Sequence, residues 1–255
     1  MMALRLAWRE LRLIARGPAF WLLLGLVQAF AAWWYLLLLE QYRSHYEPLV
    51  VRVNSPMGVN DLVVLPFYGS VLLLGALLLG AAMLAMRLLA DERRSGSLQL
   101  LLSSPISMTQ LAAGKYLAAL GCLALLALPW ILLPWTLAFG TELDFARLLS
   151  AGLGVLLLVA ALAAIALYAS SVTAQPATAA ALTVAIAVAL MGLNAGVEAV
   201  AGGDDAIADY LAMLSHYEPL VQGLIRSSDI IYFALLVLAF VGFTIRQLDS
   251  LRTQR

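Results

Sequence analysis

The chain contains two histidines, and both lie in the same seven-residue sequence. Ser44-His45-Tyr46-Glu47-Pro48-Leu49-Val50 recurs without change as residues 215–221. Imidazole, phenol and carboxylate groups at this spacing are able to contact a substrate or to bind a metal ion weakly. One interpretation is a gate that uses both copies, with the side chains of His45, Tyr46, Glu47, His216, Tyr217 and Glu218. The alternative is a pair of similar interfacial turns, in which tyrosine lies at headgroup depth and proline ends a helix.

Other motifs that carry chemistry are missing from the sequence. The Gly114-Lys115 pair has Thr109 and Tyr116 where a phosphate-binding loop needs a glycine and then a serine or threonine. There is no His-Glu-x-x-His and no Gly-x-Ser-x-Gly motif. Cys122 is the single cysteine, so neither a disulfide nor a thiolate metal site is available. We therefore predict that this chain is not an enzyme and has no catalytic residues, no bound cofactor and no metal centre.

Residues 91–105 combine charged residues with an apolar helical face. The charged stretch Asp91–Arg94 ends a hydrophobic run, and Gly96 allows the backbone to turn. Three leucines then share one side of a helix: Leu98, Leu101 and Leu102. Pro105 ends this helix because the residue before a proline is disfavoured in the α region. Ser107 and Gln110 form a capping box that starts the next helix. The pattern predicts a short amphipathic helix at the membrane surface.

Most of the chain is apolar enough to lie in lipid. Of its 255 residues, 64% are hydrophobic and 12% are charged, and the mean hydropathy is +0.95. A soluble globular domain has about 25% charged residues. A helix needs about 20 apolar residues to cross a hydrocarbon layer about 30 Å thick. Six stretches meet or approach this length: 20–39, 62–90, 116–139, 148–171, 177–201 and 230–245. Because the last is short, we expect residues 202–229 to form an outer re-entrant or interfacial segment.

Basic residues are distributed unevenly along the chain. If the N-terminus is cytoplasmic and six helices cross, the inner segments hold 11 of the 15 basic residues: Arg5, Arg9, Arg12, Arg16, Arg87, Arg93, Arg94, Lys115, Arg246, Arg252 and Arg255. Arginine and lysine are enriched in cytoplasmic loops. We therefore expect both termini and residues 91–105 to face the cytoplasm, and both copies of the duplicated motif to face outward.

Residues 1–17 have the pattern of an interfacial helix. Leu4, Trp8, Leu11 and Ala15 fall on one side, and the four arginines of this segment fall beside it. The apolar side is expected in the headgroup region, with the arginines near anionic phosphates, before Gly17-Pro18 ends the helix. Two interpretations remain: a simple positive-inside anchor, or an element that transmits movement. No cleaved signal peptide is evident in this arginine-rich start.

Ionisable residues are almost missing from the hydrophobic stretches. Arg87 lies near the inner end of the second and Glu198 near the outer end of the fifth. Carriers driven by protons or ions place such groups along the pathway of the transported species. The sequence therefore disfavours an ion-driven carrier, and the energy for any transport must come from another subunit.

Two groups of residues resemble known transporter sequences. Residues 92–107 read Glu-Arg-Arg-Ser-Gly-Ser-Leu-Gln-Leu-Leu-Leu-Ser-Ser-Pro-Ile-Ser, and Gly114-Lys115 follow. This is similar to the Glu-Arg-x-x-Gly-Thr-Leu-Glu-Leu-Leu-Leu…Pro-Ile-Ser…Gly-Lys pattern of ABC-2 type transporter permeases. Residues 169–173 and 215–233 resemble the gliding-motility (Gld-type) subgroup, and the similarity extends from the first span to the last. Ser97 replaces the usual threonine, and Gln99 replaces the usual glutamate, which removes a negative charge.

The resemblance implies an all-α membrane protein with six transmembrane helices, an N-terminal interfacial helix and a cytoplasmic coupling helix between helices 2 and 3. This is the type V, ABC-2 exporter-like fold. The residues implied to contact the ATPase are Glu92, Arg93, Arg94, Gly96, Ser97, Leu98, Gln99, Leu101, Leu102 and Pro105. The implied partners are two ABC ATP-binding subunits, which hold ATP and Mg²⁺, and a second permease that is identical or homologous.

We expect the chain to lie in the bacterial inner (cytoplasmic) membrane, to contact lipid and to bind no nucleic acid. The first functional hypothesis is a permease that exports a substrate whose class is left open. The second is a mechanical transmitter that moves or stabilises an envelope partner, such as a periplasmic protein or lipoprotein, without transporting a solute. A third hypothesis, an exporter of haem or another cofactor, would use His45 and His216 as outer ligands.

Overall fold

The computed structural model describes residues 2–48, 58–97, 107–139, 143–201 and 206–253. Within these ranges the ordered elements are all helical, which confirms the predicted all-α class. Six helices are long and apolar enough to cross a membrane: Phe20–Tyr46, Asn60–Arg94, Met108–Phe139, Phe145–Val172, Pro176–Leu193 and Ser227–Thr253. The sixth helix, Ser227–Thr253, is longer than the apolar run of residues 230–245. The polar residues on both sides of that run are also helical.

Several spans are built from consecutive helical segments. The segments up to the third span are α1 (Met2–Ala15), α2 (Pro18–Gln41), η1 (Tyr42–Tyr46), η2 (Asn60–Val64), α4 (Leu65–Tyr68), α5 (Val71–Ala85), η3 (Met86–Ala90), α6 (Asp91–Arg94), α8 (Met108–Leu132) and η4 (Leu133–Phe139). The remaining helices are α9 (Phe145–Val172), α10 (Pro176–Ala201), α11 (Ala206–Leu211), α12 (Met213–Val221) and α13 (Ser227–Thr253).

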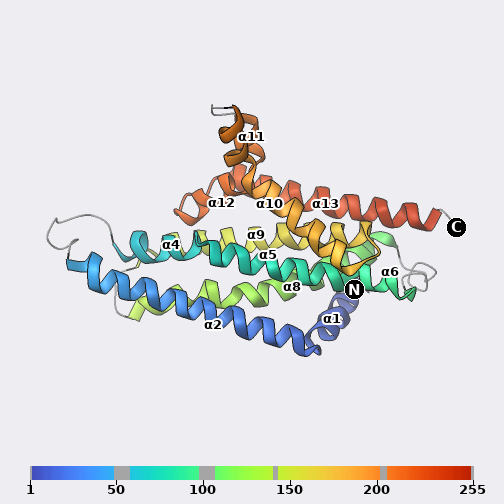
Figure 1. Ribbon diagram of the computed structural model, residues 1–255, viewed down its shortest axis with the longest axis horizontal. Helices are drawn as coiled ribbons and strands as arrows, with labels where there is room; N and C mark the ends of the chain where they lie inside the picture. The colour runs from blue at the N-terminus through green and yellow to red at the C-terminus, as the bar shows by residue number, and fades with distance from the viewer. Residues whose placement is uncertain (1, 49–57, 98–106, 140–142, 202–205, 254–255) are drawn as a thin grey trace.

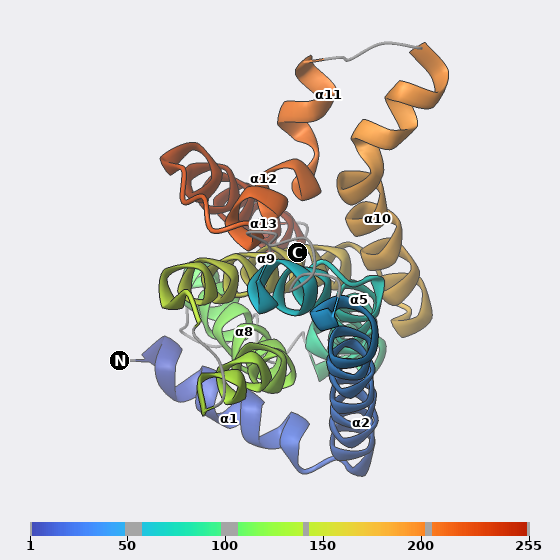
Figure 2. The ribbon, with the colours of Figure 1, turned by 90° about the vertical axis from the view of Figure 1, so that its left-hand side faces the viewer.

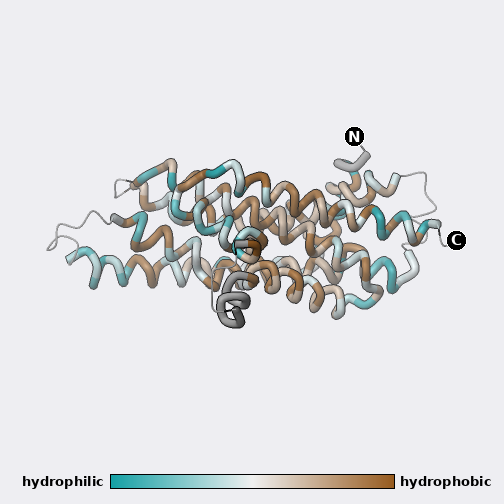
Figure 3. The backbone as a smooth tube through the Cα atoms, turned by 90° about the horizontal axis from the view of Figure 1, so that it is seen from above, coloured by the Kyte–Doolittle hydropathy of each residue, from teal (hydrophilic) through white to brown (hydrophobic). Residues whose placement is uncertain are grey.

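The long helices run side by side along one axis (Figure 1). The α6 end of this bundle holds α6, the start of α8 and the end of α13, and the α4 end holds α4 and the start of α9. Figure 3 shows hydrophobic segments along the middle of the bundle and hydrophilic segments toward its ends. This distribution is the one expected of helices that cross a bilayer.

Helix α9 forms the centre of the bundle and contacts α5, α8, α10, α12 and α13. It is buried along most of its length because its small residues let neighbouring helices approach. Gly154 is an example, since a Cβ atom there would lie 3.0 Å from the Cβ of Leu220 on α12. The C-terminal part of α10 leans away from the bundle toward α11 (Figures 1 and 2).

Aromatic residues fill the core near the α4 end. Phe67 stacks on Trp130 with ring centroids 4.9 Å apart, and Tyr35 meets Phe67 edge to face at 5.4 Å. The Tyr68 hydroxyl donates to the carbonyl oxygen of Ile131 at 3.1 Å. These contacts join α2, α4 and α8. Aromatic pairs of this kind add stability beyond the area that they bury.

Side-chain caps define where several helices begin. Ser107 Oγ accepts a hydrogen bond from the Gln110 N–H at 3.2 Å, which confirms the predicted serine cap of α8. Ser70 caps α5 in the same way through Leu73 N–H, and Asp144 caps α9. The Ser107 cap fixes the start of the third span at the α6 end, and the other two caps fix the starts of α5 and α9.

Candidate functional site

The structure describes the first half of the predicted coupling segment. Glu92, Arg93 and Arg94 belong to α6, which continues the helical path of η3. Gly96 ends this path with φ +76°, a left-handed conformation that favours glycine. Ser97 Oγ lies 2.9 Å from Ser95 Oγ. The remaining predicted contact residues lie outside the described residues: Leu98, Gln99, Leu101, Leu102 and Pro105.

Lys115 of α8 is a fully buried cation at the base of this segment. Its Nζ donates to the carbonyl oxygen of Leu88 at 2.7 Å and to Glu92 Oε1 at 2.8 Å. A second carboxylate oxygen, Glu10 Oε2 of α1, lies 3.6 Å from the same nitrogen. Burying an ammonium group is costly unless charged and polar partners surround it. The position of Lys115 therefore depends on α1, η3 and α6 together.

The neighbouring Gly114 explains how α1 reaches Lys115. A Cβ atom at Gly114 would lie 2.8 Å from Leu6 Cδ2, and one at Gly121 would lie 2.7 Å from Leu11 Cδ1. These two glycines lie two turns apart on α8 and leave room for the leucines of α1. Figure 2 shows α1 lying across the bundle against α8. The Gly114-Lys115 pair is thus the place where the N-terminal helix packs.

The N-terminal helix has one side packed against the protein and one side exposed. Ala7 and Ile14 are buried, whereas Trp8 is 56% exposed and Arg12 lies over its ring at 4.8 Å. Leu11 of the expected face packs against Gly121 of α8, whereas Trp8 of that face is exposed, and the interfacial position of this helix stays a prediction. The opposite side of α1 exposes Arg5, Arg9 and Arg12, and Arg16, directly after α1, is also exposed.

Arg93 joins the same segment to the central helix. Its Nη1 donates to the carbonyl oxygens of Ser171 at 2.9 Å and Val172 at 3.0 Å, at the C-terminus of α9. A cation at a helix C-terminus is favourable because free carbonyl groups and the helix dipole concentrate negative charge there. The charged start of the coupling segment is therefore bonded to α9 as well as to α8.

A π-helical turn lies directly before α6. The N–H groups of Leu89 and Ala90 in η3 donate to Ser170 Oγ of α9 at 2.8 and 2.9 Å. Ser170 is fully buried. Single π turns alter the regular helical hydrogen bonding and are common at functional sites. We name this set of interactions the α6 junction, and its residues are Glu10, Glu92, Arg93, Lys115 and Ser170.

The two copies of the duplicated motif have different surroundings. In the first copy, at η1, His45, Tyr46 and Glu47 are exposed, and His45 Nδ1 lies 2.7 Å from Ser44 Oγ. In the second copy, at α12, His216 and Tyr217 are buried. The Tyr217 hydroxyl donates to the carbonyl oxygen of Tyr68 at 2.9 Å, and burial raises the pKa of this hydroxyl.

His216 connects three segments near the start of α13. Its Nδ1 lies 2.8 Å from Asp229 Oδ1, and its Nε2 lies 3.0 Å from the carbonyl oxygen of Tyr210 on α11. The imidazole also stacks on Tyr232 with ring centroids 4.1 Å apart. Both ring nitrogens are thus within hydrogen-bond distance of oxygen atoms on other segments. The second copy is therefore a structural contact between α11, α12 and α13.

The glutamate of the second copy, Glu218, is exposed. No hydrogen bond or ion pair between the two copies is found in the part of the chain that the structure describes. The same part contains no group of three or more His, Cys, Asp or Glu side chains placed to hold a metal ion. The gate formed by both copies stays a prediction.

Six helices are long and apolar enough to span a membrane, and a polar junction lies at one end of the bundle, which defines a multi-pass membrane protein. The sequence pattern of ABC-2 family transporter proteins matches residues 4–247. The chain therefore belongs to the ABC-2 family, as the motifs in residues 92–115 predicted. Comparison with curated proteins gives no match. Membership of this family implies a membrane permease whose partner is an ABC ATP-binding subunit.

Lys115 was not predicted as a site residue. Its sequence neighbours include no carboxylate, and both of its acidic partners come from other helices. One feature of the sequence indicated that Lys115 has an acidic partner. A lysine within an apolar helix needs a counter-charge. Gly114 and Gly121, seven residues apart, were a second indication that another helix packs on this face.

We predict that Lys115→Met lowers the free energy of unfolding by about 3–5 kcal/mol, because it leaves Glu92 and Glu10 without a counter-charge in a largely buried site. Thermal unfolding in detergent micelles measures this change. Arg246→Met is the matched control, since Arg246 is exposed. Adding Glu92→Gln to Lys115→Met should recover part of the loss. An unfolding midpoint of Lys115→Met equal to that of the wild type would contradict the role of the junction.

The duplicated motif provides a second comparison. His216→Ala removes two hydrogen bonds and leaves the buried Asp229 without its partner, so we expect a loss of about 3 kcal/mol. His45→Ala removes an exposed ring and should change stability by less than roughly 0.5 kcal/mol. The same unfolding measurement checks both variants. Equal losses of stability in His45→Ala and His216→Ala would contradict the difference in burial between the two histidines.

Proposed function

We propose that this chain is the permease subunit of an ATP-driven exporter, in which residues 91–105 form the coupling helix. When two ATP-binding subunits close on ATP, they displace this segment, and the segment moves the second and third spans. ATP and Mg²⁺ are held by the partner subunits. This chain supplies the membrane helices and the surface that the partner contacts.

The α6 junction is the observation that supports this proposal. A simple connection between two spans needs only a few residues and no buried charge. Here Lys115 joins the start of the segment to α8 through Glu92, and Glu10 of α1 lies beside the same lysine. Arg93 joins the start of the segment to α9. A displacement of α6 would therefore be passed to α1, α8 and α9 together. We infer that these helices move as one unit during the ATP cycle.

The proposal includes a second permease, identical or homologous, so that the transport pathway forms between two copies. It places the α6 end and both termini in the cytoplasm of a bacterial cell, as the arginine asymmetry favours. Residues 215–233 support assignment to the gliding-motility (Gld-type) subgroup, and a periplasmic protein or lipoprotein is a further partner in this proposal.

A mechanical transmitter is the second candidate function, and the exposed surface of α2 and α5 favours it. Leu26, Phe30, Val71 and Leu72 line an apolar groove between these helices. If a second permease packs on this surface, the interface contains few polar groups. An interface with few polar groups offers no polar pathway, which favours a complex that moves an envelope partner and conducts no solute.

The duplicated motif adds a proposed contact at the α4 end. His45, Tyr46 and Glu47 are exposed, whereas the polar atoms of His216 and Tyr217 are engaged within the chain. We propose that the first copy provides the side chains that contact a solute or an envelope partner, and that the second copy maintains the position of α12.

Replacing both Leu98 and Leu101 with Asp should abolish co-purification with a co-expressed ATP-binding subunit, because two charges would enter a desolvated contact. Arg94→Ala, at the edge of the segment, should lower recovery only modestly, since exposed ion pairs contribute about 0–1 kcal/mol. Membrane insertion of each variant is checked by its yield after solubilisation. Undiminished recovery of the ATP-binding subunit with the double variant would contradict the coupling assignment.

A further inference from the structure

A cleft of about 580 Å³ lies between the start of the second span and α12, toward the α4 end of the bundle (Figure 1). Its apolar lining comes from α4, α5 and α12 and includes Leu65, Pro66, Val71, Leu74, Leu214 and Val221. Glu218 of α12 and Gln222, directly after α12, add polar side chains. Ligand pockets in proteins have volumes of about 300–1,000 Å³ and a few polar groups among apolar ones. The cleft has the size and the lining of such a site.

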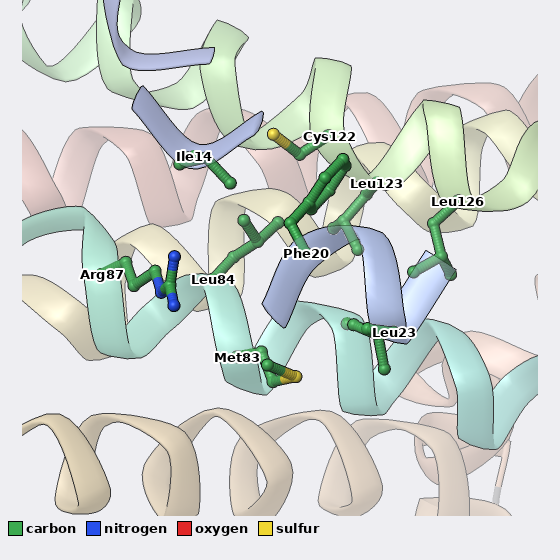
Figure 4. Close-up of a pocket in the computed structure, with 10 residues that line it drawn as sticks. Ile14, Phe20, Leu23, Met83, Leu84, Arg87, Cys122, Leu123 and Leu126 are labelled. Carbon is green, nitrogen blue, oxygen red and sulfur yellow. The ribbon is translucent and has the colours of Figure 1, made fainter. Parts of the chain in front are cut away.

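Hydrogen bonds hold the walls of this cleft in place. The Tyr217 hydroxyl donates to the carbonyl oxygen of Tyr68, and the buried Ser150 Oγ of α9 donates to the carbonyl oxygen of Leu220 at 2.7 Å. These bonds join α12 to α4 and to α9. Across the cleft, a Cβ atom at Gly69 would have no neighbour from α12 within 4 Å among the described residues. The cleft is therefore open space between fixed helices, and a ligand binds there without reorganising them. It differs in this from the narrow apolar gap lined by Phe20, Leu84 and Leu123 at the α1 side of the bundle, which is filled by packed side chains (Figure 4).

Glu218 is an exposed carboxylate, and no lysine, arginine or histidine of the described residues forms an ion pair with it. Arg147 lies against the turn that follows α12, since a Cβ atom at Gly223 would lie 2.7 Å from Arg147 Cγ. The Arg147 guanidinium, however, pairs with Asp61 at 2.8 Å and with Asp144 at 3.4 Å. The carboxylate therefore gives the cleft a negative charge that the described side chains do not neutralise, and this charge favours a cationic ligand.

An apolar cleft with an unpaired carboxylate fits an amphiphilic organic cation. Apolar walls bury the hydrophobic part of such a ligand, and the carboxylate attracts its positive charge. A neutral ligand would leave the charge of Glu218 without a partner, and an anion would be repelled. We propose that this cleft binds an organic cation with a hydrophobic body, with the positive charge against Glu218 and the body between α5 and α12.

The site gives the second copy of the duplicated motif two roles. His216 and Tyr217 bond within the chain and position α12, and Glu218 of the same copy contacts the ligand. The cleft lies toward the α4 end, away from the α6 junction (Figure 1). Binding here needs neither ATP nor the partner subunit. Its test on the chain alone is therefore independent of the proposed coupling through residues 91–105.

Equilibrium dialysis of the purified full chain in an uncharged detergent tests the site, with tetraphenylphosphonium as the probe. This ligand has one positive charge within a hydrophobic surface, and its uptake by empty micelles is subtracted. We expect the wild type to bind one cation. Glu218→Gln should raise the Kd about tenfold, because the amide lacks the charge that attracts the probe. Glu40→Gln is the matched control and should bind as the wild type does, since Glu40 is exposed on α2 and does not line the cleft.

Two further arms separate charge from shape. Tetraphenylborate has the same shape and the opposite charge, so Glu218→Gln should not weaken its binding. Leu214→Trp narrows the cleft and leaves Glu218 intact, so binding of tetraphenylphosphonium should fall although the charge is unchanged. Thermal unfolding without ligand confirms that each variant is folded.

Equal Kd values for tetraphenylphosphonium in Glu218→Gln and Glu40→Gln would overturn the proposal. The same holds if Glu218→Gln weakens the binding of tetraphenylborate as much as that of the cation. Displacement of the probe by excess phosphatidylethanolamine would also overturn it, because the cleft would then be a lipid site.

Discussion

The buried ammonium group of Lys115 is the interaction on which the α6 end depends. Removed from solvent, it requires partners, and it finds Leu88 in η3, Glu92 in α6 and Glu10 in α1. Leu88 and Glu92 lie on the continuous path of η3 and α6, whereas Glu10 lies on the N-terminal helix. The lysine therefore fixes where the N-terminal helix lies and where the segment between the second and third spans begins. A surface ion pair would not have this effect, because water would replace either partner at little cost.

Small residues allow this arrangement to form. Gly114 admits Leu6 of α1 beside Lys115, and the alanine-rich α9 lies at the centre of the spans. Close packing of this kind holds helices together in lipid, where burial of apolar surface gives little net driving force. Polar interactions are then concentrated at the ends of the bundle. In the proposed function, movement of the α6 end would be transmitted through helices whose contacts are largely apolar and tightly packed.

The sequence was sufficient to predict the all-α class, the six spans, the serine cap of α8 and the family, because each depends on local patterns. The burial of Lys115 was not predictable in the same way, since it depends on α1 packing against α8. The duplicated motif shows the reason most directly. His45 is exposed and His216 is buried against Asp229, although the seven residues around each are identical. Tertiary packing, and no local property of the sequence, determines that difference.

If the α6 junction couples these helices as proposed, α1, α6 and α8 move as one unit when ATP binds to the partner. Spin labels attached in pairs at the exposed residues Arg12, Asp91 and Thr109, in a Cys122→Ala background, would report the distances between these helices. The measurement is pulsed electron paramagnetic resonance on the complex with the ATP-binding subunit, without nucleotide and with ATP. We expect the three distance distributions to stay narrow and unchanged. A distribution that shifts or broadens on ATP binding would show that the helices separate and do not move as one unit.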